Sequence, residues 1–61
     1  MKSNDSSDSK SKILKAAEKM FAKNGFNGAR VDDIAEEAGV NKALIYYYFK
    51  SKRDILDELF S

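Results

Sequence analysis

Four aromatic residues stand side by side in the middle of the chain, from Tyr46 to Phe49, and only three others occur elsewhere. Four basic residues and no acidic ones lie between Gly39 and Arg53. Basic side chains attract phosphates, while tyrosine offers a ring and one hydroxyl that can meet phosphates or base edges. A local basic surface matters more for binding a polyanion than the net charge, which is only +1. This segment therefore predicts binding chemistry directed at a polyanion.

The residue types that most catalytic and metal sites need are missing. The chain contains no histidine and no cysteine, which removes the commonest general base, the commonest zinc ligand and any thiolate site. A site built from carboxylates or from a serine-lysine pair would need a pocket that so short a chain can hardly form. The sequence therefore predicts neither an enzyme nor a cofactor.

Length and hydropathy limit how the chain is organised. Sixty-one residues form one domain at most. No apolar run approaches the ~20 residues of a membrane span, and the polar start is unlike a secretory signal, so the cytoplasm is the expected location. Residues 1–9 have no apolar residue after Met1 and are predicted to form a flexible arm, and residues 10–61 to form the folded domain.

Apolar residues recur at helical spacing in successive segments, so the expected fold class is all-α. The first segment has an apolar face that includes Ile13. It is expected to stop at Asn24-Gly25, where glycine suits the left-handed position after a last turn. The second segment runs from Val31 to Gly39, with two aspartates in its first turn, where the helix dipole favours negative charge.

The third and fourth segments each begin with a side chain that can cap a helix. Asn41 is a good N-cap for the third segment. Ser51 can cap the fourth, with Asp54 three residues later as in a capping box. The fourth helix has an apolar face that includes Leu59 and Phe60, and the chain ends where this helix has barely begun. We therefore expect the chain to be cut within a longer helix.

The second and third segments are joined by a turn with a characteristic spacing. The small residue Ala35 is followed four residues later by Gly39, and six residues after that by the branched residue Ile45. This spacing is typical of a helix-turn-helix, in which the small residue lets two helices approach and the glycine makes the turn. Helix pairs with a glycine turn also occur in proteins that never touch DNA, so the spacing alone leaves both possibilities open.

The chain resembles the tetracycline-repressor (TetR) family of bacterial transcription regulators in "ILKAAEKMFAKNGF", in "IAEEAGVNKALIYYYFKSK" and at Ile55-Leu56. The resemblance covers nearly everything from Lys12 to Leu59. It implies a three-helix, homeodomain-like helix-turn-helix head plus the start of a fourth helix, binding double-stranded DNA sequence-specifically in the bacterial cytoplasm, in association with the nucleoid. In full-length relatives a larger helical domain, absent here, binds a small-molecule inducer and forms the homodimer that reads a palindromic operator. The expected role is that of a repressor.

Two features depart from the family pattern. Family members usually carry threonine or serine at the start of the second helix, where it caps the helix and touches a phosphate, whereas this chain has Arg30. An arginine can still reach a phosphate but cannot cap in the same way. The second departure is at positions 43 and 44, where the family often has a glycine or proline followed by a small polar residue. This chain has Ala43 and Leu44 there, which weakens the reading of bases by hydrogen bonds at that point.

Helical geometry divides the aromatic row. If Ile45 points inward, steps of ~100° place Phe49 and Tyr48 near the core, Tyr46 on the flank and Tyr47 on the opposite side. The resemblance and this geometry together predict nine DNA-contacting residues: Arg30, Asn41, Lys42, Ala43, Leu44, Tyr46, Tyr47, Tyr48 and Lys52.

Each of the main candidates has an expected role and a simpler alternative. Tyr46 is expected to donate to a phosphate on one groove wall, Tyr48 to reach the opposite wall and Tyr47 to meet base edges. Lys52, at a helix N-terminus that already favours anions, is expected to contact a phosphate. The alternatives are that Tyr48 is a half-buried core residue, that Tyr46 packs on the first helix, that Tyr47 has only a structural role and that Lys52 is an ordinary surface lysine.

A second function is compatible with the same residues. A small helical protein-interaction module could use exposed Tyr47, Leu59 and Phe60, because aromatic residues are also enriched at protein interfaces. The two functions differ in their response to salt, since only DNA binding releases counterions. In either case the 61-residue chain alone is expected to be monomeric, because the family's dimer contacts lie outside it.

Overall fold

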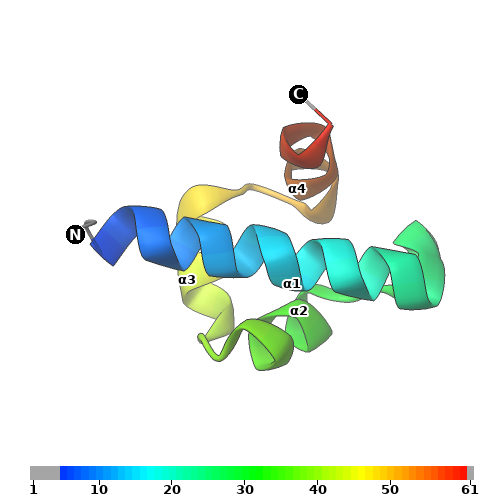
Figure 1. Ribbon diagram of the computed structural model, residues 1–61, viewed down its shortest axis with the longest axis horizontal. Coiled ribbons are helices and arrows are strands. Elements are labelled where there is room, and N and C mark those ends of the chain that lie inside the picture. The colour runs from blue at the N-terminus through cyan, green and yellow to red at the C-terminus, as the bar shows by residue number, and fades with distance from the viewer. Residues whose placement is uncertain (1–4, 61) are drawn as a thin grey trace.

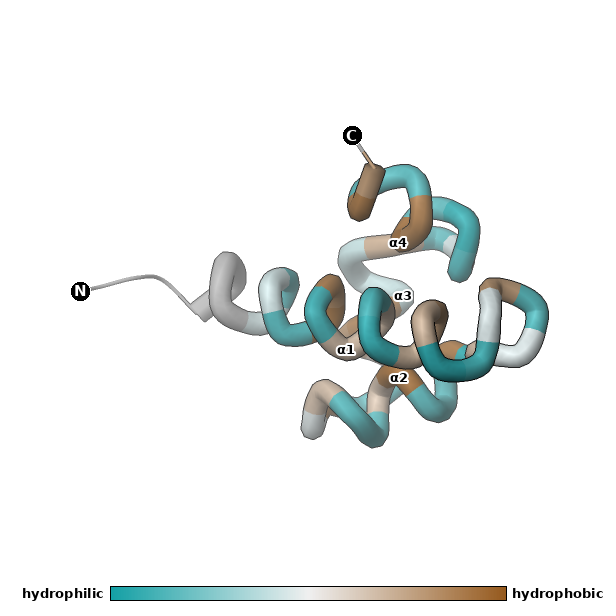
Figure 2. Tube along the Cα trace, turned by 45° about the vertical axis from the view of Figure 1, so that its right-hand side comes forward, coloured by the Kyte–Doolittle hydropathy of each residue, from teal (hydrophilic) through white to brown (hydrophobic). Residues whose placement is uncertain are grey.

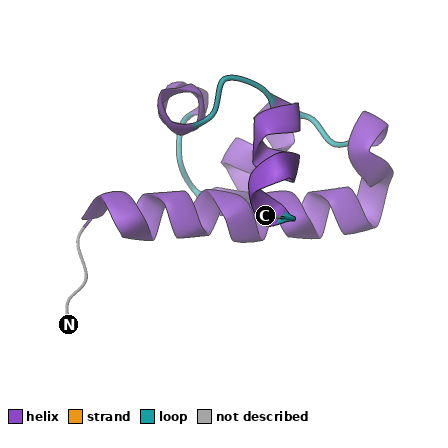
Figure 3. Cartoon of the chain, turned by 90° about the horizontal axis from the view of Figure 1, so that it is seen from above, coloured by secondary structure: helices purple, strands orange, loops and turns teal. Residues whose placement is uncertain are grey.

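The computed structural model describes residues 5–60, which form four helices and contain no strand. They are α1 (Asp5–Gly28), α2 (Val31–Ala38), α3 (Lys42–Tyr48) and α4 (Lys52–Leu59) (Figure 1). Helix α1 is the long base on which the three shorter helices are arranged (Figure 3). The all-α prediction of a three-helix helix-turn-helix head with the start of a fourth helix is confirmed.

Helix α1 begins earlier than the sequence predicted. Residues 5–9 of the expected arm are helical, and residues 1–4 lie outside the described part of the chain. The acidic and serine residues of this stretch suit a helix start, because the dipole favours negative charge there. Lys10 adds a tertiary tie, with its Nζ 3.6 Å from a Glu58 carboxylate oxygen and 6.0 Å from the centre of the Phe49 ring.

The break predicted at Asn24-Gly25 is confirmed, because Gly25 has non-helical backbone angles and a kink there separates the long part of α1 from one further turn. Gly25 has φ 78° and ψ 165°, a positive φ that favours glycine, although the ψ value differs from the expected left-handed helical one. One more turn follows as far as Gly28, and the Ala29 amide donates to the Gly25 carbonyl at 3.0 Å. This extra turn carries the chain from α1 to the start of α2.

The turn between α2 and α3 has the geometry that its spacing predicted. Gly39 adopts φ 75° and ψ 30°, in the left-handed region. Its amide donates to the carbonyls of Ala35 at 2.9 Å and Glu36 at 3.2 Å, and the Val40 amide also donates to Ala35 at 3.0 Å. These bonds satisfy carbonyls that would otherwise lack partners at the end of α2. The turn therefore fixes where α3 begins.

The two predicted N-caps are confirmed. The Asn41 Oδ1 accepts from the Leu44 amide at 2.9 Å, and the Ser51 Oγ accepts from the Asp54 amide at 3.4 Å. The Asp54 carboxylate accepts from the Lys50 amide at 3.0 Å, one residue before the position that a capping box would use. Aspartate is shorter than the usual glutamate, and here it bonds the preceding amide instead.

Each helix contributes one fully buried isoleucine to the core. Ile13, Ile34, Ile45 and Ile55 are all 0% exposed, and small residues between them let the helices approach. Ala16 and Ala17 of α1 are buried with them. Figure 2 shows the hydrophobic side of α2 turned toward α1, with hydrophilic residues along the outer surfaces. None of the described helices has both the length and the apolar character that crossing a membrane demands.

Candidate nucleic-acid interface

The exposed face of α3 follows the predicted division of its aromatic row. Tyr47 is 78% exposed and Tyr46 49% exposed, whereas Phe49 is buried. Tyr48 is half-buried and packs edge-on against Tyr47, with 5.1 Å between ring centres. Phe49 therefore anchors the helix in the core, while two tyrosines are presented outward.

Three other predicted contacts, two in the first turn of α3 and one at its N-cap, differ in their surroundings. Ala43 is exposed on the same side as Tyr47, so it stays part of the candidate interface. Leu44 is half-buried and packs against the core cluster. Asn41 is exposed, and its side-chain oxygen is already engaged in capping the Leu44 amide. These placements favour a packing role for Leu44 and a helix-positioning role for Asn41.

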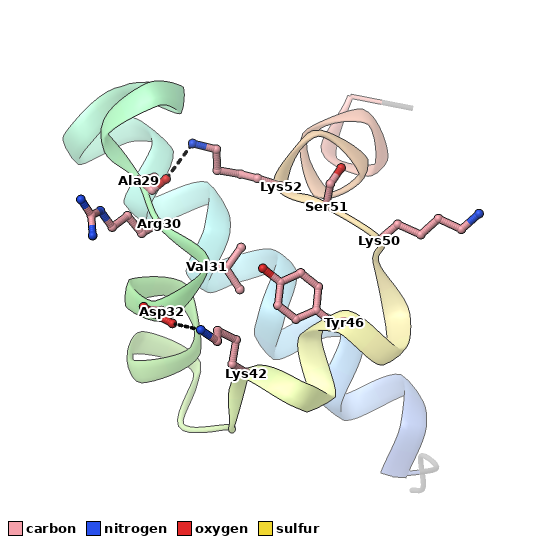
Figure 4. A pocket seen from close by; sticks show the side chains of 9 residues that line it. All are labelled: Ala29, Arg30, Val31, Asp32, Lys42, Tyr46, Lys50, Ser51 and Lys52. Carbon is pink, nitrogen blue, oxygen red and sulfur yellow. Dashed lines mark hydrogen bonds and ion pairs between the residues drawn. The ribbon is translucent and has the colours of Figure 1, made fainter.

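A shallow hollow of about 330 Å³ lies beside α3, between the start of α2 and the start of α4. Figure 4 shows the Tyr46 hydroxyl pointing across it toward Val31, with Arg30 and Lys50 extending outward from its rim. The lining has four cations and a single carboxylate, so it is strongly positive. The nine lining residues are Ala29, Arg30, Val31, Asp32, Lys42, Tyr46, Lys50, Ser51 and Lys52.

An ion pair stands inside this hollow. The Lys42 Nζ lies 2.8 Å from the Asp32 Oδ1 (Figure 4). The hydrogen bond and charge of Lys42 lower the pKa of the Asp32 carboxyl below its ordinary value of 3.8, and the Arg30 charge lowers it further. The same pairing raises the pKa of Lys42 above 10.5. Because the pKa of Asp32 is lowered, its carboxyl is protonated, and the ion pair lost, only when the pH falls through that lowered pKa. Both side chains are therefore charged at neutral pH.

Arg30 occupies the N-cap position of α2 without capping it. Its backbone is extended, and its side chain makes no capping hydrogen bond, as the sequence predicted for an arginine at this point. Asp32 and Asp33 in the first turn complement the helix dipole instead. The guanidinium is therefore held at the rim of the hollow and is exposed to solvent.

Lys52 is placed differently from the prediction of an anion-binding lysine. Its Nζ donates to the Phe26 carbonyl at 2.5 Å and to the Ala29 carbonyl at 2.9 Å, and it lies 4.4 Å from the centre of the Phe26 ring. Both carbonyls lie after the break in α1, where the last carbonyls of a helix have no amide partner within the helix and need a donor from elsewhere. Lys52 therefore ties the start of α4 to the end of α1, and two of its three N–H donors are occupied.

This placement predicts a stability effect for Lys52. Lys52→Met keeps the length of the side chain but removes the ammonium, and it should lower the free energy of unfolding by about 1–3 kcal/mol, because two carbonyls lose a charged donor. Arg53→Met is the matched control, since Arg53 is exposed and forms an i,i+4 ion pair with Asp57 at 3.5 Å, a kind of pair worth ~0.5 kcal/mol. Urea unfolding followed by circular dichroism measures both variants. Equal losses would contradict the tying role.

Several residues of the hollow were not among the predicted contacts. Asp32, Lys50 and Ser51 all line it. The only sequence signal for Asp32 is the contrast between four acidic residues in 31–38 and four basic ones in 39–53. That contrast indicates attraction between the two segments but does not identify which side chains pair. Within residues 5–60, no group of three or more acidic side chains is arranged to hold a metal ion.

Comparison with known proteins identifies the family. The family model for bacterial regulatory proteins of the tetR family matches residues 13–59. The chain belongs to the TetR family. The resemblance that the sequence suggested is therefore confirmed, and the helix-turn-helix described above is the DNA-binding domain of this family.

Relatives of this TetR-family chain are regulators. It is 48% identical over 48 residues to the fatty acid metabolism regulator protein of Bacillus subtilis (strain 168), covering 79% of this chain and 25% of that protein. It is 51% identical over 43 residues to the HTH-type transcriptional repressor NicS of Pseudomonas putida, covering 70% and 20%. The chain thus spans about a quarter or less of the length of these relatives.

Solved structures agree with the family assignment. The crystal structure of HlyIIR, a hemolysin II transcriptional regulator, superimposes with a TM-score of 0.85 at 40% identity, covering 90% of this chain and 31% of that one. A HlyIIR mutant protein gives a TM-score of 0.89 at 38% identity, covering 93% and 32%. The arrangement of α1–α4 is therefore that of a TetR-family head.

Proposed function

We propose that this chain is the head of a ligand-responsive bacterial transcriptional repressor and that it binds double-stranded DNA sequence-specifically. The observation that carries the proposal is the exposed face of α3, with Tyr46 and Tyr47, standing next to a hollow that has four cations and one carboxylate. In a helix-turn-helix the second helix of the motif enters the major groove. Helix α3 is that helix here.

The side chains on this surface fall into two groups. Tyr47 and Ala43 face outward from the middle of α3 and meet base edges, where a ring can touch a thymine methyl. The hollow beside them takes a backbone phosphate, approached by the Tyr46 hydroxyl, Lys42 and Arg30. Contacts of this second kind position a protein on DNA without reading sequence.

We propose two further contacts with DNA. Tyr48 is rotated ~160° from Tyr46 around α3. Its ring is half-buried, and the exposed part reaches the DNA backbone on the opposite wall of the groove, at a phosphate or a sugar. Lys52 retains one N–H donor beyond its two carbonyl bonds, and it offers that donor to the phosphate in the hollow. Lys52 therefore contributes less to DNA binding than the resemblance alone implied.

The remaining parts of the proposal concern a regulator longer than this chain. We propose that residues 10–61 are the DNA-binding domain and that a larger domain, as in the longer relatives, binds the inducer and forms a homodimer on a palindromic operator. Two heads in such a dimer would sit about 34–36 Å apart, one helical turn. The protein acts in the bacterial cytoplasm at the nucleoid, without enzymatic activity, and the 61-residue chain alone is monomeric.

Salt dependence tests the proposed DNA binding. The chain should bind a fluorescent duplex with a log K against log salt slope between about −2 and −4, because two to four phosphate contacts each release counterions. Affinity would then fall by roughly 15- to 250-fold between about 50 and 200 mM salt. Fluorescence anisotropy measures the slope. Absence of duplex binding at low salt would contradict the proposal.

One observation favours a second candidate function. Phe60 is 81% exposed at the end of α4, and Tyr47 is similarly exposed, so both are available to another protein. A protein-interaction module would bind its partner through apolar area, and this binding would change little with salt. The same titration therefore separates the two functions.

A further inference from the structure

We propose that Asp32 is an internal competitor of the DNA phosphate, holding Lys42 inside the hollow and so limiting the affinity of this head for DNA. This inference rests on the proposed function, because it concerns the same phosphate-binding surface. Asp32 contributes the only carboxylate among the nine lining residues, against four cations. Its Oδ1 lies 2.8 Å from the Lys42 Nζ, a full charge-assisted hydrogen bond.

The pair stands where a phosphate would have to bind. Lys42 and Tyr46 are one helical turn apart on α3, and both line the hollow (Figure 4). A phosphate that accepts from the Tyr46 hydroxyl would therefore approach the Lys42 ammonium, which Asp32 already engages. It must either displace the carboxylate or bind with that like charge at close range. Both routes reduce the affinity for DNA.

The structure also indicates that the carboxylate can be displaced. The side chains of Lys42 and Asp32 are 53% and 65% exposed, and an exposed ion pair is weak because water screens it. The Lys42 stem is long and flexible, so its ammonium can turn from a carboxylate to a phosphate. Asp32 therefore lowers affinity without blocking the site.

The expected sign distinguishes competition from positioning. If Asp32 competes, Asp32→Asn should raise affinity for duplex DNA of any sequence by about two- to fivefold, the fold-change that corresponds to an exposed ion pair. If Asp32 instead holds Lys42 in a productive place, the same variant should bind more weakly. Asp33→Asn is the matched control, because it removes the same charge from the same first turn of α2 but does not line the hollow.

A double-mutant cycle with Lys42 tests the specific pair. We would measure anisotropy of a fluorescent, random-sequence duplex of roughly 20 base pairs at about 100 mM salt. The variants are Asp32→Asn, Asp33→Asn, Lys42→Gln and the Asp32→Asn/Lys42→Gln double variant. Circular dichroism confirms that each is folded.

The expected result is a gain for Asp32→Asn that exceeds the gain for Asp33→Asn and is largely lost in the Lys42→Gln background. A gain of equal size with and without Lys42, or an equal gain for Asp33→Asn, would show a general charge effect and overturn the inference. A loss of affinity for Asp32→Asn would also overturn it. If the unmodified chain and every variant failed to bind duplex DNA at low salt, the proposed function itself would be wrong, and the inference with it.

Discussion

Replacing Ile45 with alanine is expected to remove a large share of the free energy of unfolding of the domain. Ile45 is fully buried and comes from α3, so its loss opens a cavity between the recognition helix and the rest of the core. Such a replacement costs about 2–5 kcal/mol. A domain of 61 residues has only about 3–9 kcal/mol of stability in total. Urea unfolding followed by circular dichroism measures the loss.

Graded and exposed replacements serve as controls for Ile45. Ile45→Val removes one methylene group and should cost only about 0.5–1.5 kcal/mol. Glu36→Ala changes an exposed residue on α2 and should stay within about 0.5 kcal/mol of the unmodified chain. If Ile45→Ala were no more damaging than Glu36→Ala, the packing of α3 on the core would be wrong.

Replacing Tyr47 with alanine is expected to change which bases the head tolerates. Tyr47 is 78% exposed. Its ring makes an edge contact with Tyr48 but is not part of the hydrophobic core. Fold stability should therefore change little. If its ring and hydroxyl meet base edges, their removal should relax discrimination by about 1–3 kcal/mol at one or two positions of the site. Selection of bound sequences from random duplex DNA measures this preference.

Tyr46→Phe is the matched comparison for the change at Tyr47. It removes only the hydroxyl that points across the hollow, so it should weaken binding by about 0.5–3 kcal/mol without altering base preference. Unchanged preference after Tyr47→Ala would contradict the division between base contact and phosphate contact. A changed preference after Tyr46→Phe would contradict it equally.

Much of the fold could be predicted because local chemistry and tertiary packing agree. Asn41 and Ser51 cap helices where their side chains suggest, and Gly39 turns where a left-handed residue is needed. The exception is α1. Its start at Asp5 and its extra turn after Gly25 were not predicted, because a polar stretch and a glycine ordinarily signal a helix end.

The candidate site was predictable only in part. The ~100° step along a helix is enough to place Tyr46 on the flank and Tyr47 outward, since both lie on one regular element. The partners of Lys42 and Lys52 could not be predicted in this way. Lys52 reaches carbonyls at residues 26 and 29, and Lys42 reaches a carboxylate on α2, so both contacts depend on how distant segments are brought together.

The measurement that most directly tests the central claim is an NMR titration of the isotope-labelled chain with duplex DNA. We predict that the largest amide shifts fall on α3 from Lys42 to Tyr48, at Arg30 and at the start of α4 near Ser51. Amides on the outer side of α1 around Lys15 should change little. Shifts concentrated around Phe60 at the end of α4 or along α1, with α3 unaffected, would contradict the account.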